Sequence, residues 1–150
     1  MMLRGELVTM QVGIDGRGRR VVRYGERVVV LNGAGDDLRS CIENDLRVFA
    51  RDELAPRLHA LAAKHGVKVS RLSIRNQRSR WGSCSRAGGI ALNYRLVQMP
   101  PAVCDYVLVH ELMHLKEQNH SRRFWRLVEA VCPDFRQAER WLRRHGPGLL

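Results

Sequence analysis

His110, Glu111 and His114 are the residues whose types and spacing predict chemistry most directly. Residues four apart lie on the same face of a helix, so the two imidazoles could ligate one metal ion. The Glu111 carboxylate would lie beside that face, within reach of a water on the metal. This is the H-E-x-x-H arrangement, whose chemistry is attack of a zinc-bound water on a carbonyl with the glutamate as general base. The pattern therefore predicts Zn²⁺ on His110 and His114 and a catalytic role for Glu111.

A catalytic zinc site also needs a third protein ligand and an open position for water. We favour His120, because Asn119 could adopt the left-handed conformation that ends a helix and so turn His120 back toward the ion. Glu129 is the alternative, since some zinc peptidases take a glutamate from the following helix. Glu117 stands where the metzincin pattern has glycine, so the pattern is not that of a standard metzincin.

The segment that carries this chemistry is a predicted helix over 102–118. Apolar side chains surround much of it, so we expect a buried helix whose histidines and glutamate need a polar partner, which a metal ion would supply. Ser121 and Asp134 are placed to cap two further amphipathic helices, one over 122–131 and a last one that begins at residue 135 and ends at Gly146.

The first part of the chain predicts strands followed by a long helical region. Asp36 and Asp37 are candidate N-caps of that region, which Gly66 ends, and Pro56 predicts either a kink or two abutting helices. Two later strands, over 67–75 and 90–94, are expected to pair as antiparallel neighbours. The alternating apolar residues of the N-terminal part predict strands over 6–14, 21–24 and 27–31.

The length predicts one domain over residues 1–150, and the predicted strands and helices make it α+β, with a β-rich part at 1–35 and a core at 36–146. The first residues lack the apolar core of a signal peptide, and no apolar run approaches the roughly 20 residues of a membrane-spanning helix. We therefore expect a cytoplasmic protein with no membrane partner. Four scattered cysteines without a C-x-x-C pair favour reduced thiols over a cysteine-based zinc site.

The charge of the chain is strongly basic, with a formal net charge of +11 that comes almost wholly from arginine. No acidic residue occurs from Leu54 to Cys104. Such a field would attract polyanions or acidic protein segments. The plainer interpretation is a solvated, arginine-rich surface.

Several motifs together resemble the YgjP-like metallopeptidase family, which is itself similar to SprT-like and other minimal zincins. The resemblance covers roughly residues 51–146 and implies Zn²⁺ on His110, His114 and His120, with Glu111 as general base. The motifs that carry it are Arg80-Trp81-Gly82-Ser83-Cys84-Ser85, Ile90-Ala91-Leu92-Asn93-Tyr94-Arg95-Leu96, Pro100, Asp105-Tyr106-Val107, His110-Glu111-Leu112, His114-Leu115, Asn119-His120-Ser121 and Phe124-Trp125.

The resemblance also implies a fold and a way of binding substrate. It implies a small zincin-like domain in which a short mixed or antiparallel sheet packs on the buried active-site helix, with further C-terminal helices. The edge strand of that sheet, expected over Ile90–Tyr94, would hold an extended peptide by main-chain hydrogen bonds. Candidate substrate-binding residues are Ile90, Leu92, Tyr94, Arg95 and Tyr106, and the last three are also candidates for stabilising the oxyanion.

Three functions remain in competition at the level of the sequence. The leading hypothesis is a zinc-dependent peptidase acting on peptide or protein substrates. The second is a nucleic-acid-associated protease or binding module recruited by its arginines, since SprT-like relatives act on DNA-bound proteins. The third is a zinc-stabilised scaffold without catalytic turnover. Substitution of Glu111 separates the first from the third, and the salt dependence of nucleic-acid binding tests the second.

Overall fold

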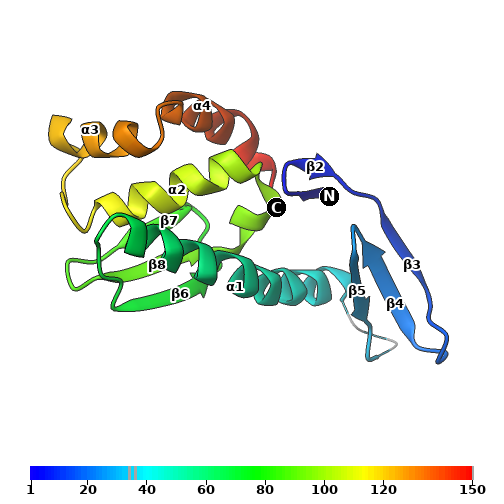
Figure 1. Cartoon of the computed structure of the whole chain (residues 1–150). Helices are drawn as coiled ribbons and strands as arrows, with labels where there is room; N and C mark the ends of the chain where they lie inside the picture. The colour runs from blue at the N-terminus through cyan, green and yellow to red at the C-terminus, as the bar shows by residue number, and fades with distance from the viewer. Residues whose placement is uncertain (34, 36, 150) are drawn as a thin grey trace.

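Helix α2 (Pro101–Met113), which carries His110 and Glu111, lies between two C-terminal helices and a small β-sheet in the computed structural model (Figure 1). The structure describes residues 1–33, 35 and 37–149. Helices α3 (Arg122–Val131) and α4 (Phe135–His145) pack on one side of α2, and strand β7 (Gly82–Cys84) packs on the other. The long helix α1 (Leu38–Lys64) packs against the far strand of the same sheet. The fold is α+β, as predicted.

The sheet beside α2 differs from the prediction in its strand direction. Its order is β6-β8-β7, with β6 (Arg71–Arg75) parallel to β8 (Gly89–Asn93) and β7 antiparallel to β8. The predicted antiparallel pairing of the strands over 67–75 and 90–94 is therefore wrong. The short strand β7 lies between β6 and β8 in the sequence and pairs antiparallel with β8. The chain therefore reverses direction twice between β6 and β8, so these two strands run parallel. As a result β8 is the central strand, and the prediction that Ile90–Tyr94 forms the edge is also wrong.

Helix α2 is shorter than the predicted helix over 102–118, because its C-terminal turn tightens at His114. The backbone N–H groups of Leu115 and Lys116 bond to carbonyls three residues back, and the Gln118 amide donates to the His114 carbonyl at 2.7 Å. The chain leaves the helix through this turn and not through a left-handed Asn119. Among the described residues, Arg4 is the only non-glycine with positive φ (49°), so the prediction for Asn119 is wrong.

The C-terminal helices follow the prediction closely. α3 spans the predicted residues, and the Ser121 hydroxyl accepts from the Phe124 N–H at 3.3 Å as its N-cap. α4 ends at His145, and the 3₁₀ turn η2 (Gly146–Gly148) follows. Asp134 precedes α4 without a side-chain capping bond, so its predicted capping role is wrong.

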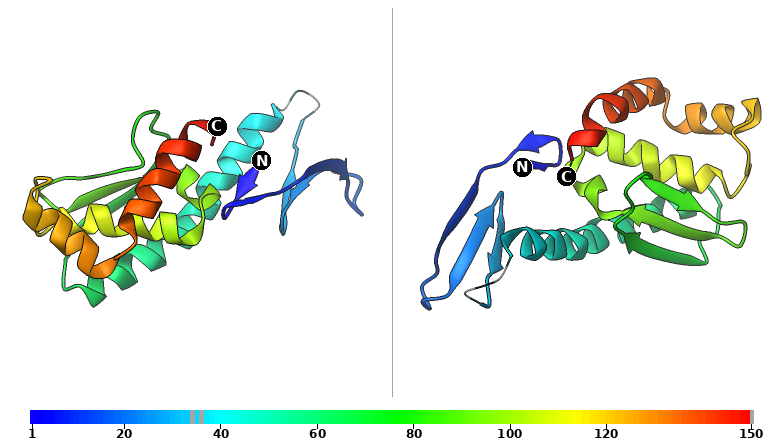
Figure 2. Two further views of the ribbon diagram at one scale, coloured as in Figure 1. Left: turned by 90° about the horizontal axis from the view of Figure 1, so that it is seen from above. Right: turned by 180° about the vertical axis from the view of Figure 1, so that it is seen from behind.

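Helix α1 is continuous over 27 residues and passes through Pro56 without a break into two helices. Asp37 is its N-cap and accepts from the N–H groups of Arg39 and Ser40. The other predicted cap, Asp36, lies outside the described residues. α1 runs from the sheet near α2 to a second sheet at its N-terminal end (Figure 2).

That second sheet is antiparallel and consists of β3 (Met10–Ile14), β4 (Arg20–Tyr24) and β5 (Arg27–Val30). The predicted strand over 6–14 is divided, because the Val8 N–H bonds back to the Met1 carbonyl and closes a small hairpin of β1 (Met2–Leu3) and β2 (Glu6–Leu7). This hairpin docks on the 3₁₀ turn η1 (Tyr94–Gln98) through backbone bonds from Arg4 to Val97 and from Gly5 to Gln98.

One cluster of buried apolar side chains runs from Leu3 to Leu149 and includes residues of both sheets and of every helix. The N-terminal strands and the C-terminal helices thus share a core. No helix in the described part of the chain is long and apolar enough to cross a membrane.

Asp45 on α1 anchors the N-terminal sheet. Its carboxylate accepts from the Tyr24 hydroxyl and from the Arg27 guanidinium, with Arg27 Nη2 at 2.7 Å from Oδ1. Burial alone would raise the pKa of Asp45, but the hydrogen bonds from Arg27 and Tyr24 and the charge of Arg27 outweigh burial and lower it. The ionised carboxylate therefore stabilises the fold.

Replacing Asp45→Asn should lower the free energy of unfolding by about 1–3 kcal/mol at pH 7, because a charge-assisted network is lost. The pKa of Asp45 is lower in the folded state, so this contribution is complete above about pH 4 and disappears as the pH falls further. Urea denaturation across this pH range should show the wild type and the variant converging in acid.

The control is Glu43→Gln on the same helix, which removes surface ion pairs with Arg39 and Arg47. Such pairs contribute about 0–1 kcal/mol. Equal losses for the two variants, or a difference that persists undiminished in acid, would contradict the anchoring role of Asp45.

Candidate metal centre

Three histidines converge at the C-terminal end of α2. The nitrogen ligand atoms of His110, His114 and His120 all lie within 4.8 Å of one another, and the Nε2 atoms of His110 and His120 are 3.1 Å apart. His110 and His114 are on one face of the helix, as their spacing predicts, and the tight turn after His114 brings His120 to them. Glu129 does not belong to this group.

His110 and His114 are each oriented by a partner at the Nδ1 ring nitrogen. The Tyr106 hydroxyl lies 3.2 Å from Nδ1 of His110 and donates to the Glu139 carboxylate at 3.2 Å. Its oxygen is then the acceptor for an Nδ1–H of His110. Similarly, Nδ1 of His114 lies 3.2 Å from the Glu117 carbonyl, which can only accept. Both contacts place the proton on Nδ1 and leave Nε2 as the free donor atom for a metal.

An aromatic wall from α3 holds the three rings in place. Phe124 is fully buried, stacks on His114 with centroids 4.4 Å apart, and meets His110 and His120 edge-on at 5.0 Å. Trp125 stacks on His120 at 5.8 Å. The Ser121 cap therefore has a consequence for the site, because it sets the start of the helix that carries both aromatic residues.

Burial also sets the protonation state of the cluster. Burial, followed by the neighbouring charges of His114 and His120, lowers the pKa of His110 to about 4. Burial likewise lowers the pKa of His114. Both imidazoles are therefore neutral at physiological pH, which is the form that ligates a metal.

Glu111 is buried next to this cluster, with 7% of its surface exposed. Burial raises the pKa of its carboxyl group to about 7, and the charge of Arg80 opposes this shift. A carboxyl group with a pKa near neutrality can both take up and release a proton at working pH.

The backbone of β7 passes directly over the Glu111 side chain. A Cβ atom on Gly82 would lie 2.8 Å from Cγ and 2.9 Å from Oε1 of Glu111. Such a contact is closer than packed carbon atoms allow, so only glycine permits this approach of strand and carboxyl group. Gly82 therefore sets how close the strand comes to the buried acid.

The donor set fits a divalent metal ion of the zinc type. Three imidazoles converge from one helix and the turn that follows it, with two of them oriented by hydrogen bonds. Two nitrogen ligands about 2.0–2.1 Å from one tetrahedral ion lie about 3.3 Å apart, close to the separation of His110 and His120. Three nitrogen ligands leave a fourth position open, which is the arrangement of catalytic and not of structural sites.

The structure places the other predicted site residues in different surroundings. Tyr106 contacts His110 and is part of the site. Ile90 and Leu92 are core side chains of the central strand β8, with 2% and 0% exposed. Tyr94 is buried, and the guanidinium groups of Arg47 and Arg95 contact its ring. Arg95 is also buried and lines a cavity beside the loop that precedes β7.

Four residues with a clear place in the site were not singled out from the sequence as such: Phe124, Gln118, Glu139 and Gly82. Glu139 had a signal that was available, since it is the only acidic residue in the otherwise basic helix α4. Gly82 lies within the motif Arg80–Ser85, but its contact with Glu111 depends on how β7 packs on α2. The positions of Phe124 and Gln118 depend in the same way on the turn after His114.

Comparison with protein families gives a match over most of the chain. A family model described as the YgjP-like metallopeptidase domain matches residues 1–145, which include the N-terminal strands. Comparison with curated proteins gives no match. Among solved structures, the chain is similar to the crystal structure of the metallopeptidase zymogen of Pyrococcus abyssi abylysin. The two share 28% sequence identity over 67% of this chain and 92% of that chain, with a TM-score of 0.47.

The third-ligand assignment can be tested by metal binding alone. His120→Ala should weaken Zn²⁺ binding by roughly 100-fold or more, because even the hydrogen-bond partners of ligating histidines are worth about 10–100-fold in affinity. Glu129→Ala should leave the affinity unchanged, since this side chain lies outside the cluster. Competition with a chromophoric chelator measures both. A loss for Glu129→Ala that matches or exceeds the loss for His120→Ala would assign the ligand to α3 instead.

Proposed function

The chain belongs to the YgjP-like metallopeptidase family, and from this premise we propose that it is a zinc-dependent peptidase. In this proposal His110, His114 and His120 hold Zn²⁺, and Glu111 is the general base. The observation that carries it is the convergence of three imidazoles beside a buried carboxyl group whose pKa is raised to about 7. We also propose that residues 1–150 work as one domain, since a single core joins their two ends.

When bound, Zn²⁺ supplies Lewis acidity, which polarises the peptide carbonyl and makes water a stronger nucleophile at neutral pH. Glu111 takes the proton from the attacking water and then delivers it to the amine that leaves. Its buried position keeps the energies of the charged and neutral carboxyl forms close together, so both transfers are feasible at neutral pH. Tyr106, held by Glu139, keeps His110 in the orientation that leaves Nε2 for the metal.

Strand β7 is the element best placed to align a peptide. It is the outermost strand of its sheet on the side of α2, and Gly82 in this strand lies against Glu111. An extended peptide that pairs with β7 would run past the catalytic carboxyl group. In this arrangement the buried residues Ile90 and Leu92 do not contact the peptide themselves. They lie on β8 and pair with β7, which they hold in position.

The variant Glu111→Gln tests the catalytic role directly. It should retain Zn²⁺ and the fold but lose about 10²–10⁴-fold in kcat/KM for peptide cleavage, the range that a general base contributes. Glu129→Gln is a control, because it removes an exposed carboxylate on α3 and should leave cleavage unaffected. The measurement uses unstructured protein or peptide substrates with the zinc content determined in parallel.

Cleavage by Glu111→Gln at the wild-type rate would contradict the mechanism. Absence of cleavage by the zinc-loaded wild type would instead support the zinc-stabilised scaffold.

A further inference from the structure

A cavity of about 450 Å³ lies between the loop that leads into β7 and the C-terminal end of α4. Four arginines line it: Arg78, Arg80, Arg95 and Arg143. We propose that this cavity binds an acidic side chain of the substrate, so that the peptidase prefers Asp or Glu close to the scissile bond. The inference rests on the proposed peptidase function and assigns a substrate class to it.

The four arginines of the cavity have no carboxylate partner within the described residues, unlike Arg39, Arg47 and Arg57 on α1. The ion pairs of the described residues involve none of Arg78, Arg80, Arg95 and Arg143. The lining of the cavity contains no acidic side chain among the described residues. The cavity therefore concentrates positive charge that an anion can neutralise.

Arg95 is the most informative of the four because it is buried, with 6% of its surface exposed. It donates to the Asn76 amide oxygen at 2.7 Å and stacks on the Tyr94 ring at 4.7 Å. Neither partner carries charge. A buried guanidinium without a counter-charge is costly, and a carboxylate that enters the cavity would remove much of this cost.

The cavity is built on a rigid frame. Asn93, at the end of β8, donates from its amide to the carbonyls of Gln77 and Arg80 at 2.7 and 3.0 Å. These two bonds fix the loop that leads into β7 against the end of β8. On the other wall, Trp81 packs so closely on Gly146 that a Cβ there would lie 2.8 Å from the indole. The arginines are therefore carried by fixed backbone, and the site is largely preformed.

The cavity also adjoins the catalytic group. Arg80 and Trp81 directly precede Gly82, whose backbone touches Glu111, and the charge of Arg80 is felt at the Glu111 carboxyl. A peptide aligned on β7 would therefore place a side chain near the catalytic residue within reach of the arginines.

The cavity favours a peptide over a phosphate as its ligand. The side-chain oxygen of Gln77 on the cavity wall is buried and has no hydrogen-bond partner within the described part of the chain. It needs a donor, and a peptide brings backbone N–H groups together with its side-chain carboxylate, whereas a phosphodiester brings only acceptors.

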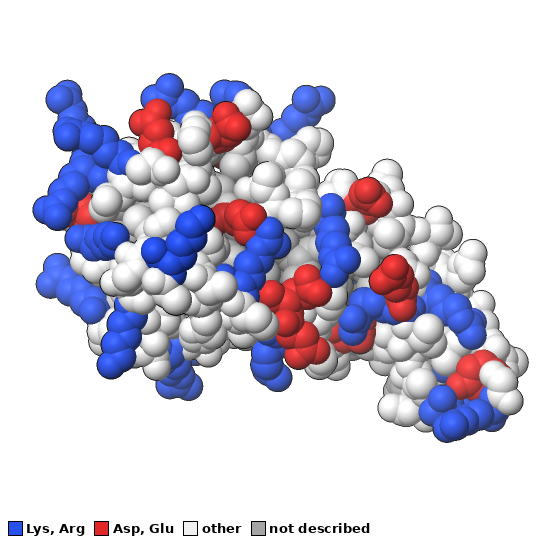
Figure 3. Space-filling model, in the orientation of Figure 1, with Lys and Arg blue, Asp and Glu red and all other residues white. Residues whose placement is uncertain are grey.

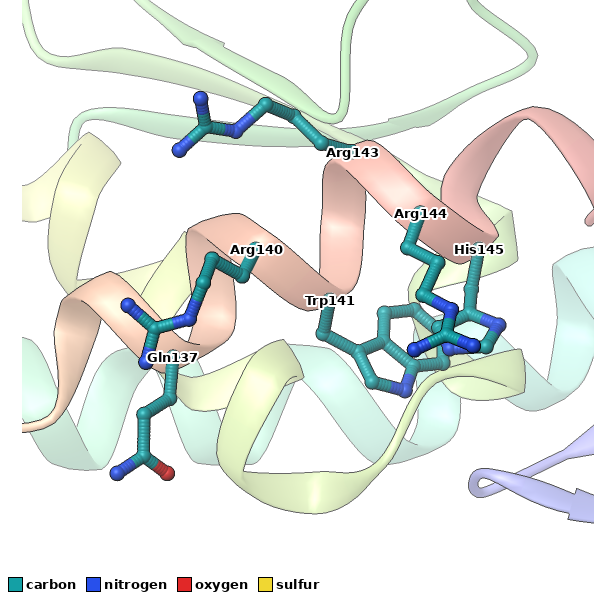
Figure 4. A pocket seen from close by; sticks show the side chains of 6 residues that line it. All are labelled: Gln137, Arg140, Trp141, Arg143, Arg144 and His145. Atoms are coloured by element: carbon teal, nitrogen blue, oxygen red, sulfur yellow. The ribbon is translucent and has the colours of Figure 1, made fainter.

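The helix α4 offers a matched pair of arginines for a test. Arg143 points from α4 to one side, and Arg144 points to the other, beside Trp141 and His145 (Figure 4). Both are exposed, but only Arg143 lines the cavity beside the loop that leads into β7. Lys and Arg also rim the end of the molecule that carries α3 (Figure 3), so a matched charge control is needed to separate local from general attraction.

The experiment compares two fluorogenic peptides that differ only by Glu against Gln within three residues of the scissile bond. The zinc-loaded wild type should cleave the acidic peptide about tenfold faster, the value of one good charge-assisted contact. Arg143→Gln should reduce this preference about threefold, since an exposed arginine contributes less, and Arg78→Gln/Arg143→Gln should reduce it further. Arg144→Gln makes the same change in net charge and should keep the wild-type preference.

Binding is measured in parallel by fluorescence anisotropy with Glu111→Gln protein, so that the inference is tested even if no peptide is cleaved. Equal cleavage or binding of the two peptides, or equal effects of Arg143→Gln and Arg144→Gln, would overturn the acidic-side-chain site while leaving the peptidase proposal intact. If no peptide is cleaved but the acidic peptide still binds more tightly, the proposed peptidase function is contradicted and the binding site for an acidic side chain is supported. A single-stranded oligonucleotide that displaces the acidic peptide, and whose own binding is lost in Arg143→Gln, would assign the cavity to nucleic acid and overturn the inference.

Discussion

The burial of ionisable groups on one largely apolar helix is the constraint on which the rest of the structure depends. Helix α2 and the residue that ends it, His114, bring two histidines and a glutamate toward the interior, where polar groups without partners are costly. Tyr106 and Glu139 satisfy His110, and the Glu117 carbonyl satisfies His114. The turn after the helix, the start of α3 and the single acid of α4 all serve this purpose. What these partners leave free for a metal are ligand nitrogens of three histidines, which all lie within 4.8 Å of one another.

The arginines that support the fold and the arginines close to Glu111 lie in different parts of the molecule. The N-terminal sheet lies at the N-terminal end of α1 (Figure 2) and is held there by Asp45. The positive charge of Arg27 in this sheet is neutralised by the Asp45 carboxylate. The arginines near Glu111 are not neutralised, although they belong to the same basic chain. We therefore interpret the strong positive charge as two populations, one that stabilises α1 and its sheet and one that is available to a ligand. Nucleic-acid binding stays a prediction that the fold does not require.

Local patterns predicted the elements well, and non-local contacts account for the failures. The spacing of His110 and His114, the cap at Ser121 and the range of α3 depend on neighbouring residues, and all were predicted from the sequence. The parallel pairing of β6 and β8 depends on β7, a strand of three residues whose Gly-Ser-Cys sequence has no strand pattern. The end of α2 depends on the Gln118 side chain bonding back to His114, which no helical periodicity reveals. Likewise, the contact of Gly82 with Glu111 exists only once β7 packs on α2.

We propose that this site binds one zinc ion and that peptide hydrolysis depends on it. The most direct measurement is titration of the metal-free protein with Zn²⁺ while the rate of peptide cleavage is followed. We expect no cleavage without metal and a cleavage rate that rises linearly with added Zn²⁺ and saturates at one ion per chain. Cleavage that persists in the metal-free protein, or that requires more than one ion per chain, would contradict it.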